Sequence, residues 1–237
     1  MLLVLAAMTI PFSYDGSLRS GRTLEVRDIN GSVRVHTGDR LSIHAIKQSE
    51  RGDANAVAIH VENRPSGIVV CVRYPPDANL GCDESNESSH NGDNDTSVAF
   101  DITVPHGITL DARTVNGSID AVNDGPAMVE TVNGSIHVQG RTVRTARTIN
   151  GSVEVTMLDR GSGSLDAHTI NGSITVTLPS GSGVALVART STGGITADGF
   201  NVERPRYGPG AQASGTVGDG ARKLDLETMN GSITVRR

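Results

Sequence analysis

A short motif, Thr-x-Asn-Gly-Ser-Ile/Val, recurs along this chain of 237 residues and constrains its fold more than any other feature. A degraded copy occupies residues 190–195, and an outlying copy occupies residues 28–33. A motif that returns at nearly constant intervals is the signature of a repeat architecture. The regular copies occupy residues 114–119, 131–136, 148–153, 169–174 and 228–233.

The intervals between copies take few values. The motif asparagines Asn116, Asn133 and Asn150 follow one another at steps of 17 residues. The next two steps, to Asn171 and then to Thr192, are 21 residues each. The step from Thr192 to Asn230 is 38 residues, which equals one step of each kind. We therefore expect that one copy of the motif has eroded between them.

Apolar and polar residues alternate on both sides of each copy. Leu165 and Ala167 precede Asn171 at alternating positions, and Ile174 and Val176 follow it in the same way. This period of two predicts a strand, a corner and a second strand, with one apolar face. Asn-Gly at the corner favours a turn with positive φ.

One such unit cannot bury its apolar face alone, but units stacked in register can. We therefore predict an all-β fold, a β-solenoid (a β-helix-like or β-roll-like stack) preceded by irregular β strands. A meander of two-residue hairpins stays open as the alternative, because Asn-Gly also forms that turn.

In a stack, identical residues of successive units lie above one another at about 4.8 Å. Such columns allow side-chain amides to hydrogen-bond from unit to unit. The predicted structural ladder consists of Asn116, Asn133, Asn150, Asn171 and Asn230, together with Thr114, Thr131, Thr148, Thr169 and Thr228.

Two outward rows accompany this ladder. Arg113, Glu130 and Arg147 lie three residues before the asparagines and would form the ion pairs Arg113–Glu130 and Glu130–Arg147, unless their alternation is chance on a solvated face.

An apolar residue stands directly before each asparagine, and an exposed apolar row marks a contact surface. Alternatively, residues 200–222 or a second layer cover it. The predicted contact stripe is Val115, Val132, Ile149, Ile170 and Met229.

The chain divides into three segments. We expect a signal-peptide remnant over residues 1–20, an irregular β region over 21–97 with an acidic loop at 83–97, and the repeat stack over 98–237. A Pro- and Gly-containing insertion at 200–222 is expected to form a surface loop. We also expect the last strand, Ile233 to Arg237, to be an open edge whose charged end discourages further pairing.

Two features bear on the cellular compartment. Residues 1–10, MLLVLAAMTI, resemble the apolar core of a secretory signal peptide, with a buried first strand as the alternative. Cys71 and Cys82 are the only cysteines, and in an exported protein we expect them to form a disulfide. Both features favour an extracytoplasmic place: periplasm, cell envelope or secreted. No membrane anchor is visible in the sequence.

The formal net charge is -5, and the acidic run at 83–97 carries five negative charges. This balance argues against nucleic acid as a partner. The run has no apolar anchor and is expected to be a solvated loop. Calcium binding by its carboxylates is the alternative, although the EF-hand pattern is absent.

The sequence contains no recognisable nucleophile elbow, phosphate loop or metal-binding motif. We therefore predict no enzyme activity, no catalytic residue, no cofactor and no metal site. The alternative is a carbohydrate-active β-helix enzyme, which needs paired carboxylates on one face. Asp120, Glu130 and Glu154 would be its candidates.

The early Asn-Gly strand, the strand that ends at Val104-Pro105 and the serial Asn-Gly units resemble the bacterial putative-adhesin family of envelope proteins, over about Leu24 to Arg237. The resemblance implies a β-strand repeat domain and an extracytoplasmic place, but no catalytic residues. It favours an adhesin or envelope scaffold that presents a repeated surface to a protein or glycan partner, or to itself. A sensor module of an envelope-stress system is the alternative.

Overall fold

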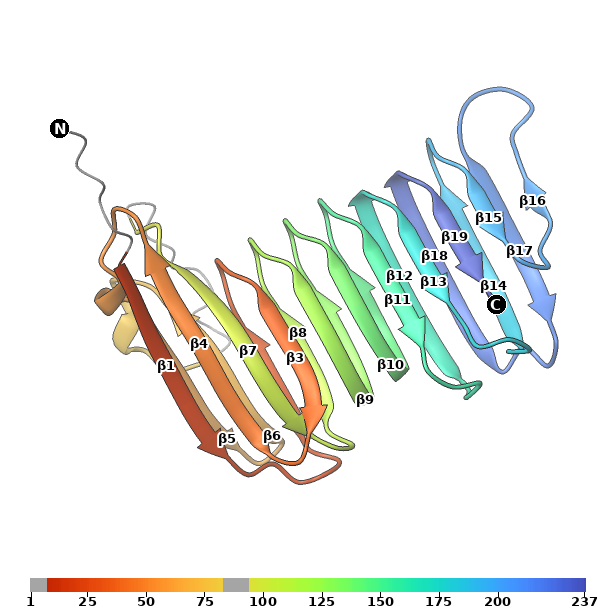
Figure 1. Ribbon diagram of the computed structural model, residues 1–237. Coiled ribbons are helices and arrows are strands. Elements are labelled where there is room, and N and C mark those ends of the chain that lie inside the picture. The colour runs from red at the N-terminus through yellow and green to blue at the C-terminus, as the bar shows by residue number, and fades with distance from the viewer. Residues whose placement is uncertain (1–7, 83–93) are drawn as a thin grey trace.

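The computed structural model describes residues 8–82 and 94–237. In these ranges the chain forms strands and two short 3-10 helices, so the predicted all-β class is confirmed (Figure 1). The first elements are β1 (Met8–Gly16), β2 (Thr23–Arg27), β3 (Val33–Gly38), β4 (Leu41–Ser49), η1 (Ala54–Ala56), β5 (Ala58–Arg64), β6 (Gly67–Arg73) and η2 (Asp77–Asn79). The next are β7 (Ser97–Pro105), β8 (Thr109–Arg113), β9 (Ile119–Glu130), β10 (Ile136–Arg147), β11 (Val153–Met157), β12 (Gly163–Asn171) and β13 (Ile174–Thr177). The last are β14 (Val184–Thr190), β15 (Ile195–Ala197), β16 (Val202–Glu203), β17 (Ala211–Val217), β18 (Arg222–Asn230) and β19 (Ile233–Arg236).

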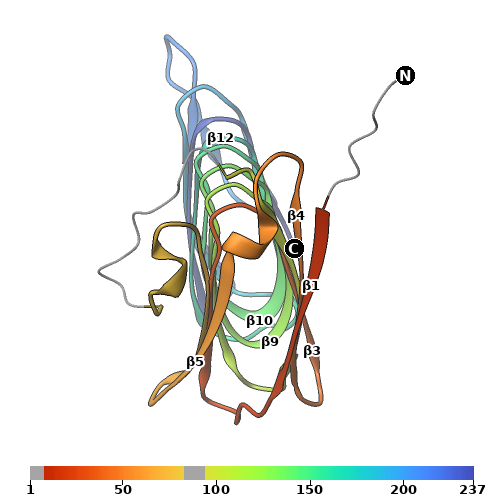
Figure 2. The same cartoon turned by 90° about the vertical axis from the view of Figure 1, so that its left-hand side faces the viewer.

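Each motif copy forms a unit of two strands around an Asn-Gly-Ser corner. In one unit, β12 ends at Asn171 and β13 begins at Ile174. Viewed along the stack, the strands form two walls that the corners join (Figure 2). Strands of neighbouring units pair in parallel and in register, as when Ile136 pairs with Val153. The hairpin meander is therefore wrong for these copies, because the flanking strands pair between units.

The order of units along the stack differs from their order in the chain. The Asn30 unit lies inside the stack, because β2 pairs with both β6 and β8, and β3 with both β7 and β9. The Asn230 unit also lies inside, because β18 pairs with both β12 and β14, and β19 with both β13 and β15. The resulting order of units is Asn30, Asn116, Asn133, Asn150, Asn171, Asn230 and Thr192.

Two expectations about the C-terminal end are therefore wrong. The interval of 38 residues holds no eroded copy; it holds β16 and β17, and β17 pairs antiparallel with β14. Residues 200–222 thus contain strands as well as a loop. The final strand, β19, is not an open edge, because it pairs on both sides.

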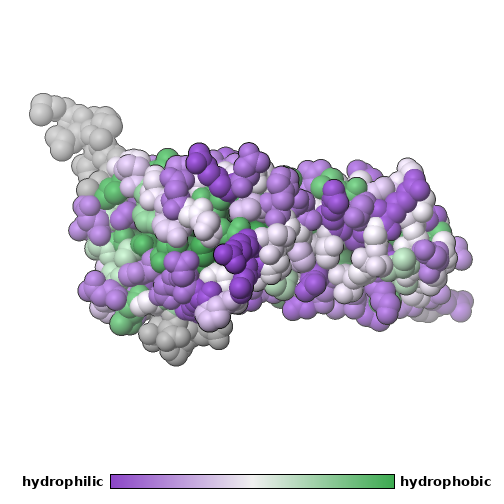
Figure 3. Space-filling model, turned by 90° about the horizontal axis from the view of Figure 1, so that it is seen from below, coloured by the Kyte–Doolittle hydropathy of each residue, from purple (hydrophilic) through white to green (hydrophobic). Residues whose placement is uncertain are grey.

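Antiparallel strands form the other end of the stack. β4 pairs with β7, β1 with β4, and β5 with β6. Residues 8–16 of the signal-like segment lie in β1, whereas residues 1–7 lie outside the described residues. Seen from below, hydrophobic side chains gather over the N-terminal half, and the C-terminal half is mainly polar (Figure 3). In the described ranges, no helix has the length and apolar character needed to cross a membrane.

The core lies between the two walls and runs the length of the stack. Burial alternates along the strands, so that Leu110 and Ala112 of β8 are fully buried while Arg113 is exposed. All residues of β6 are buried, which departs from this alternation. Cys82 packs with Val69 and Cys71 in a second small cluster, so the loop after β6 covers its outer face.

Candidate functional site: a groove along one corner of the stack

The motif asparagines lie in one column at the corner. The Nδ2 of Asn133 donates to the Oδ1 of Asn116 at 2.9 Å, and the Nδ2 of Asn150 donates to the Oδ1 of Asn133 at 2.8 Å. The same bond continues to Asn171 at 2.7 Å and to Asn230 at 2.8 Å. Each amide thus joins two units, and the column fixes their register.

The motif threonines form a second, buried column beside the asparagines. The hydroxyl of Thr131 donates to the carbonyl of Gly117 at 2.9 Å, and that of Thr148 donates to the carbonyl of Gly134 at 2.9 Å. Because a buried carbonyl without a partner is costly, these hydroxyls stabilise the corner. The equivalent donors in the other units are Thr114, Thr169, Thr228 and Thr190.

Glycine is required at the corners mainly because the stacked backbones approach each other closely, and less because of the backbone angle φ. Among the glycines that follow the motif asparagines, only Gly31 and Gly151 have a positive φ, so the expectation of a positive-φ turn is wrong for most copies. A Cβ on Gly134 would lie 2.1 Å from the carbonyl oxygen of Gly117, and one on Gly172 would lie 1.9 Å from that of Gly151. Stacked backbones therefore exclude any side chain here.

The apolar residues before the asparagines form an outward row. Val115, Ile149, Ile170 and Met229 are 38–50 % exposed, and Val132 is half-buried. Residues of the segment 203–212 line a pocket with Arg189 and Ser191 of the last unit and with Glu227 of the Asn230 unit. The apolar row over the preceding units therefore faces solvent.

The row has one member that the repeat spacing did not identify. Ile29, directly before Asn30, occupies the equivalent position and is half-buried. The backbone N–H of Asn116 donates to the carbonyl of Ile29 at 2.8 Å, which places Ile29 next to Val115. The motif itself was the available signal, but the place of this copy in the stack was unknown. We call the six residues Ile29, Val115, Val132, Ile149, Ile170 and Met229 the apolar stripe.

A charged row runs beside the apolar stripe. The Nε of Arg113 lies 3.6 Å from the Oε2 of Glu130, as expected. The expected Glu130–Arg147 pair is wrong, because Arg147 makes two hydrogen bonds to Asp166 at 2.9 and 2.7 Å. These bonds hold the pKa of the Asp166 carboxyl below its usual value. In the order of the stack, the charged row is Arg27, Arg113, Glu130, Arg147, His168, Glu227 and Arg189.

The two rows enclose a groove of about 410 Å³ over the central units. The buried threonine column forms its floor. At this volume the groove is within the range of ligand sites, although it is open along its length. Its lining residues are Arg113, Thr114, Glu130, Thr131, Val132, Arg147, Thr148, Ile149, His168 and Ile170.

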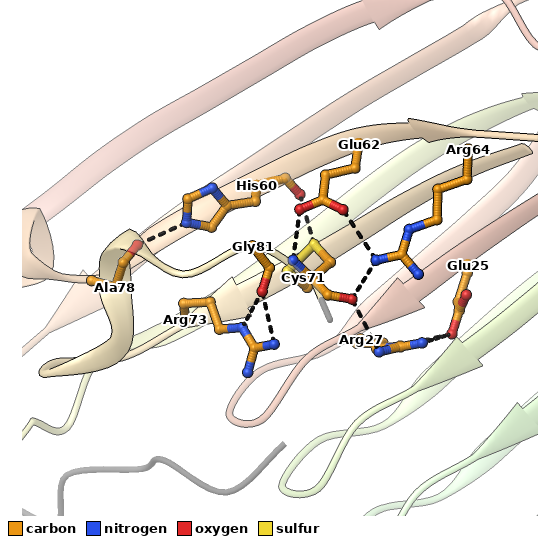
Figure 4. Close-up of a disulfide and its surroundings, with 10 residues drawn as sticks. Glu25, Arg27, His60, Glu62, Arg64, Cys71, Arg73, Ala78 and Gly81 are labelled. Atoms are coloured by element: carbon orange, nitrogen blue, oxygen red, sulfur yellow. Dashed lines mark hydrogen bonds and ion pairs between the residues drawn. A yellow bond between two sulfur atoms is a disulfide. The ribbon is translucent and has the colours of Figure 1, made fainter. Parts of the chain in front are cut away.

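Cys71 and Cys82 form a disulfide near the N-terminal end of this groove (Figure 4). Polar side chains hold the loop that the disulfide closes. The carboxylate of Glu62 accepts from the backbone N–H of Cys82 at 2.6 Å, and this bond lowers its pKa below the usual value. The guanidinium of Arg64 donates to the carbonyl of Cys82, and that of Arg73 donates to the carbonyl of Gly81 at 2.9 Å. The loop is therefore fixed against the outer face of β6.

Two of the three carboxylates considered for glycan cleavage, Asp120 and Glu154, line one small pocket, and the third does not. Asp120 and Glu154 lie on the wall formed by the strands after the corners, where His137 stands between them and lies 3.5 Å from Glu154. Glu130 belongs to the groove on the other side of the corners. The structure therefore does not bring Glu130 together with either of the other two candidate carboxylates.

Most of the acidic run lies outside the described residues, so the expected solvated loop, with calcium binding as its alternative, stays a prediction. Asp95 is described, and its carboxylate accepts from the hydroxyl of Ser49 at 2.5 Å and from the backbone N–H of Gly52 at 2.9 Å. These bonds lower the pKa of Asp95 to about 2. Over residues 8–82 and 94–237, no group of three or more His, Cys, Asp or Glu side chains is placed to hold a metal ion.

Three solved structures that match this chain bear names that refer to adhesion. A "putative cell adhesion protein" from Clostridium sporogenes matches with a TM-score of 0.54 and 14 % identity, over 97 % of this chain and 99 % of that one. A "putative adhesin" from Bacteroides fragilis has a TM-score of 0.35 and 9 % identity, over 95 % and 97 % of the two chains. Another from Parabacteroides distasonis has a TM-score of 0.30 and 8 % identity, with the same coverage. No protein-family model and no curated protein sequence matches the chain. The similarity to the first structure extends over nearly the whole chain and shows a shared fold.

Proposed function

We propose that this chain is a non-enzymatic β-solenoid protein that acts as an adhesin or envelope scaffold, with the apolar stripe as its contact surface. The observation that carries the proposal is the alignment of exposed aliphatic side chains in successive units, four of them 38–50 % exposed. A continuous apolar row on a soluble surface usually marks a contact. Ile170 and Met229 lie at the ends of β12 and β18, and the other four residues lie in the corner bends that directly follow the paired strands.

The columns beneath this surface give it rigidity. Hydrogen bonds between the amides of Asn116, Asn133 and Asn150, at 2.9 and 2.8 Å, tie each unit to the next. Because the contact residues precede these asparagines directly, their spacing along the stack is fixed before any partner binds. A preorganised surface loses less conformational entropy on binding than a mobile one.

We further propose an extracytoplasmic place for the protein. The disulfide between Cys71 and Cys82 supports this, because such bonds persist in oxidising compartments. The name of the Clostridium sporogenes protein, which refers to cell adhesion, agrees with it.

The test replaces Val132 and Ile149 by Ser and measures adhesion of protein-coated beads to mucin, to fibronectin and to a surface carrying the same protein. We expect adhesion to fall while the melting temperature changes little, because both side chains face the groove. Val122→Ser is the matched control, since Val122 is 39 % exposed on the other wall. Unfolding of the double variant would assign the stripe to the core, and unchanged adhesion would remove it as the contact surface.

A further inference from the structure

We propose that the groove and its apolar stripe form a two-fold interface with a second copy of this chain, with the two stacks running antiparallel. This inference rests on the proposed function, because it names the partner of the same surface. A two-fold axis in the plane of the interface, perpendicular to the stack, places stripe on stripe and charged row on charged row.

The apolar residues fix the register of this pairing. Six successive units carry an aliphatic residue directly before the corner, and the seventh carries the exposed Ser191. Only an axis between the Val132 and Ile149 units brings all six aliphatic residues opposite one another. The facing pairs are then Ile29 with Met229, Val115 with Ile170, and Val132 with Ile149 of the second copy.

The charged row is complementary in the same register. Glu130 lies opposite Arg147 of the second copy. Arg27 lies at the level of Glu227, but its side chain is only 12 % exposed and forms an ion pair with Glu25, so the charge match rests on Glu130 and Arg147. Arg113 faces the only histidine of the row, His168. Like charges of arginine and glutamate do not face each other in this arrangement, and opposite charges across an interface set its register.

Neighbouring registers fail on charge and lose apolar pairs. A shift of one unit in one direction places Arg147 opposite its own counterpart, although it also places Arg113 opposite Glu227. A shift in the other direction places Glu130 opposite its own counterpart, and Arg113 opposite Arg147. Like-charge contacts of this kind oppose association. The apolar row therefore selects this register, and the Glu130–Arg147 contacts agree with it.

The interface is narrow. Six units at about 4.8 Å give it a length of roughly 25–30 Å. An interface that follows one corner of the stack is smaller than the roughly 800 Å² per partner of a standard stable complex. We therefore expect a weak dimer whose population depends on protein concentration.

The test is a charge exchange followed by sedimentation equilibrium of the full chain at about 10 μM to 1 mM, a range that covers weak dissociation constants. Glu130→Arg and Arg147→Glu should each weaken dimerisation about tenfold or more, because each creates like-charge contacts at two symmetric places. The double variant should return to within about threefold of the original dissociation constant, because opposite charges then face each other again at both places. Far-UV circular dichroism checks the fold, since Glu130 and Arg147 also lie near Arg113 and Asp166.

A chain that stays monomeric over this concentration range would overturn the inference. So would a double variant that dimerises no better than the single variants, or a dimer that survives Val132→Ser with Ile149→Ser. Val122→Ser should leave the dimer unchanged. If the chain is monomeric but its adhesion to mucin or fibronectin still depends on the stripe, the second-copy inference fails while the proposed function stands.

Discussion

The same side-chain contacts join neighbouring units at the centre of the stack and at its two ends, but the chain connects those units differently. In the centre, the units of Asn116, Asn133 and Asn150 follow one another in the chain, 17 residues apart. At the ends, Thr114 bonds to Gly31 across 83 residues, and Thr190 bonds to Gly231 across 41. The motif therefore encodes a contact, whereas the choice of neighbour comes from the rest of the chain.

This difference explains how the ends are closed. The first and last motif units of the chain lie inside the stack. After the first unit the chain runs outward to one end, and before the last unit it returns inward from the other end. The outermost strands at one end are the antiparallel strands β1 and β5. At the other end the antiparallel strands β17 and β16 complete one wall, while the parallel strand β15 is the last strand of the other wall. A regular parallel unit at the end would expose a complete row of backbone groups, which favours edge-to-edge association.

The largest expected effect comes from removing residues 222–237, which form β18 and β19. This deletion takes away the inner unit and leaves β14 and β15 without their parallel partner. Each buried Leu, Ile or Val that is lost costs roughly 1.5–3 kcal/mol, so we expect residues 184–217 to unfold. Hydrogen exchange would measure this. Unchanged protection of β14 would mean that the last unit lies outside the stack.

A large effect is also expected in the centre from Gly134→Ala. The new Cβ would lie 2.1 Å from the carbonyl oxygen of Gly117, so two stacked backbones must separate. We expect a loss of about 3 kcal/mol or more of unfolding free energy. Gly194→Ser in the last unit is the control, because a Cβ there meets nothing within 4 Å. Equal urea midpoints for the two variants would contradict close stacking at the centre.

The N-terminal end differs from the centre at Asp28, which occupies the motif position that a buried threonine occupies in the other units. Its Oδ1 accepts from the backbone N–H of Ile29 at 2.8 Å, its Oδ2 is buried without a partner, and burial raises its pKa from 3.8 to about 7. Between pH 4 and 7 the folded state binds the extra proton. Stability therefore falls as pH rises through this window, by about 4 kcal/mol in all.

Asp28→Asn should remove this loss. Chemical denaturation at pH 4 and pH 8 would compare the two proteins, and the variant should be the more stable at pH 8. Parallel pH profiles for the two proteins would show that Asp28 has an ordinary pKa in the folded state.

The smallest effect tests whether the threonine hydroxyls contribute to stability in the same way at the centre and near the end of the stack. Thr148→Val in the centre and Thr190→Val near the end each leave one glycine carbonyl without its hydroxyl donor, and Thr190→Val also removes the acceptor of the Gly193 backbone N–H. Each should cost about 1–3 kcal/mol, with the loss for Thr190→Val equal to or larger than that for Thr148→Val. Thermal unfolding of both variants measures this. A much smaller loss for Thr190→Val would show that the end contact is weaker than its geometry implies.

The sequence indicates the local parts of this fold well, for identifiable reasons. The alternation around Asn171 predicts two strands, and the recurrence of Thr148 and Asn150 predicts columns, because both signals lie within one copy. The cysteines are so few that only one intramolecular pair is available to them.

The order of units could not be read from the sequence, because each corner can pair equally well with any other. The 38-residue step before Asn230 was the one signal of a detour, and it fits an eroded copy as well as it fits β16 and β17. The same ambiguity hid the place of Ile29 in the apolar stripe. It also concealed that Arg147 lies beside Asp166.

Cysteine cross-linking of the corner serines tests the central claim most directly. Ser173 and Ser232 belong to adjacent units, and the backbone N–H of Ser232 donates to the Oγ of Ser173 at 3.2 Å. A disulfide needs Cα atoms no more than about 7 Å apart, whereas units two steps apart are separated by about 9.6 Å. The account predicts that S173C/S232C cross-links within the folded chain and that S173C/G194C does not. Cross-linking of S173C/G194C without S173C/S232C would contradict it, because the units would then stack in chain order.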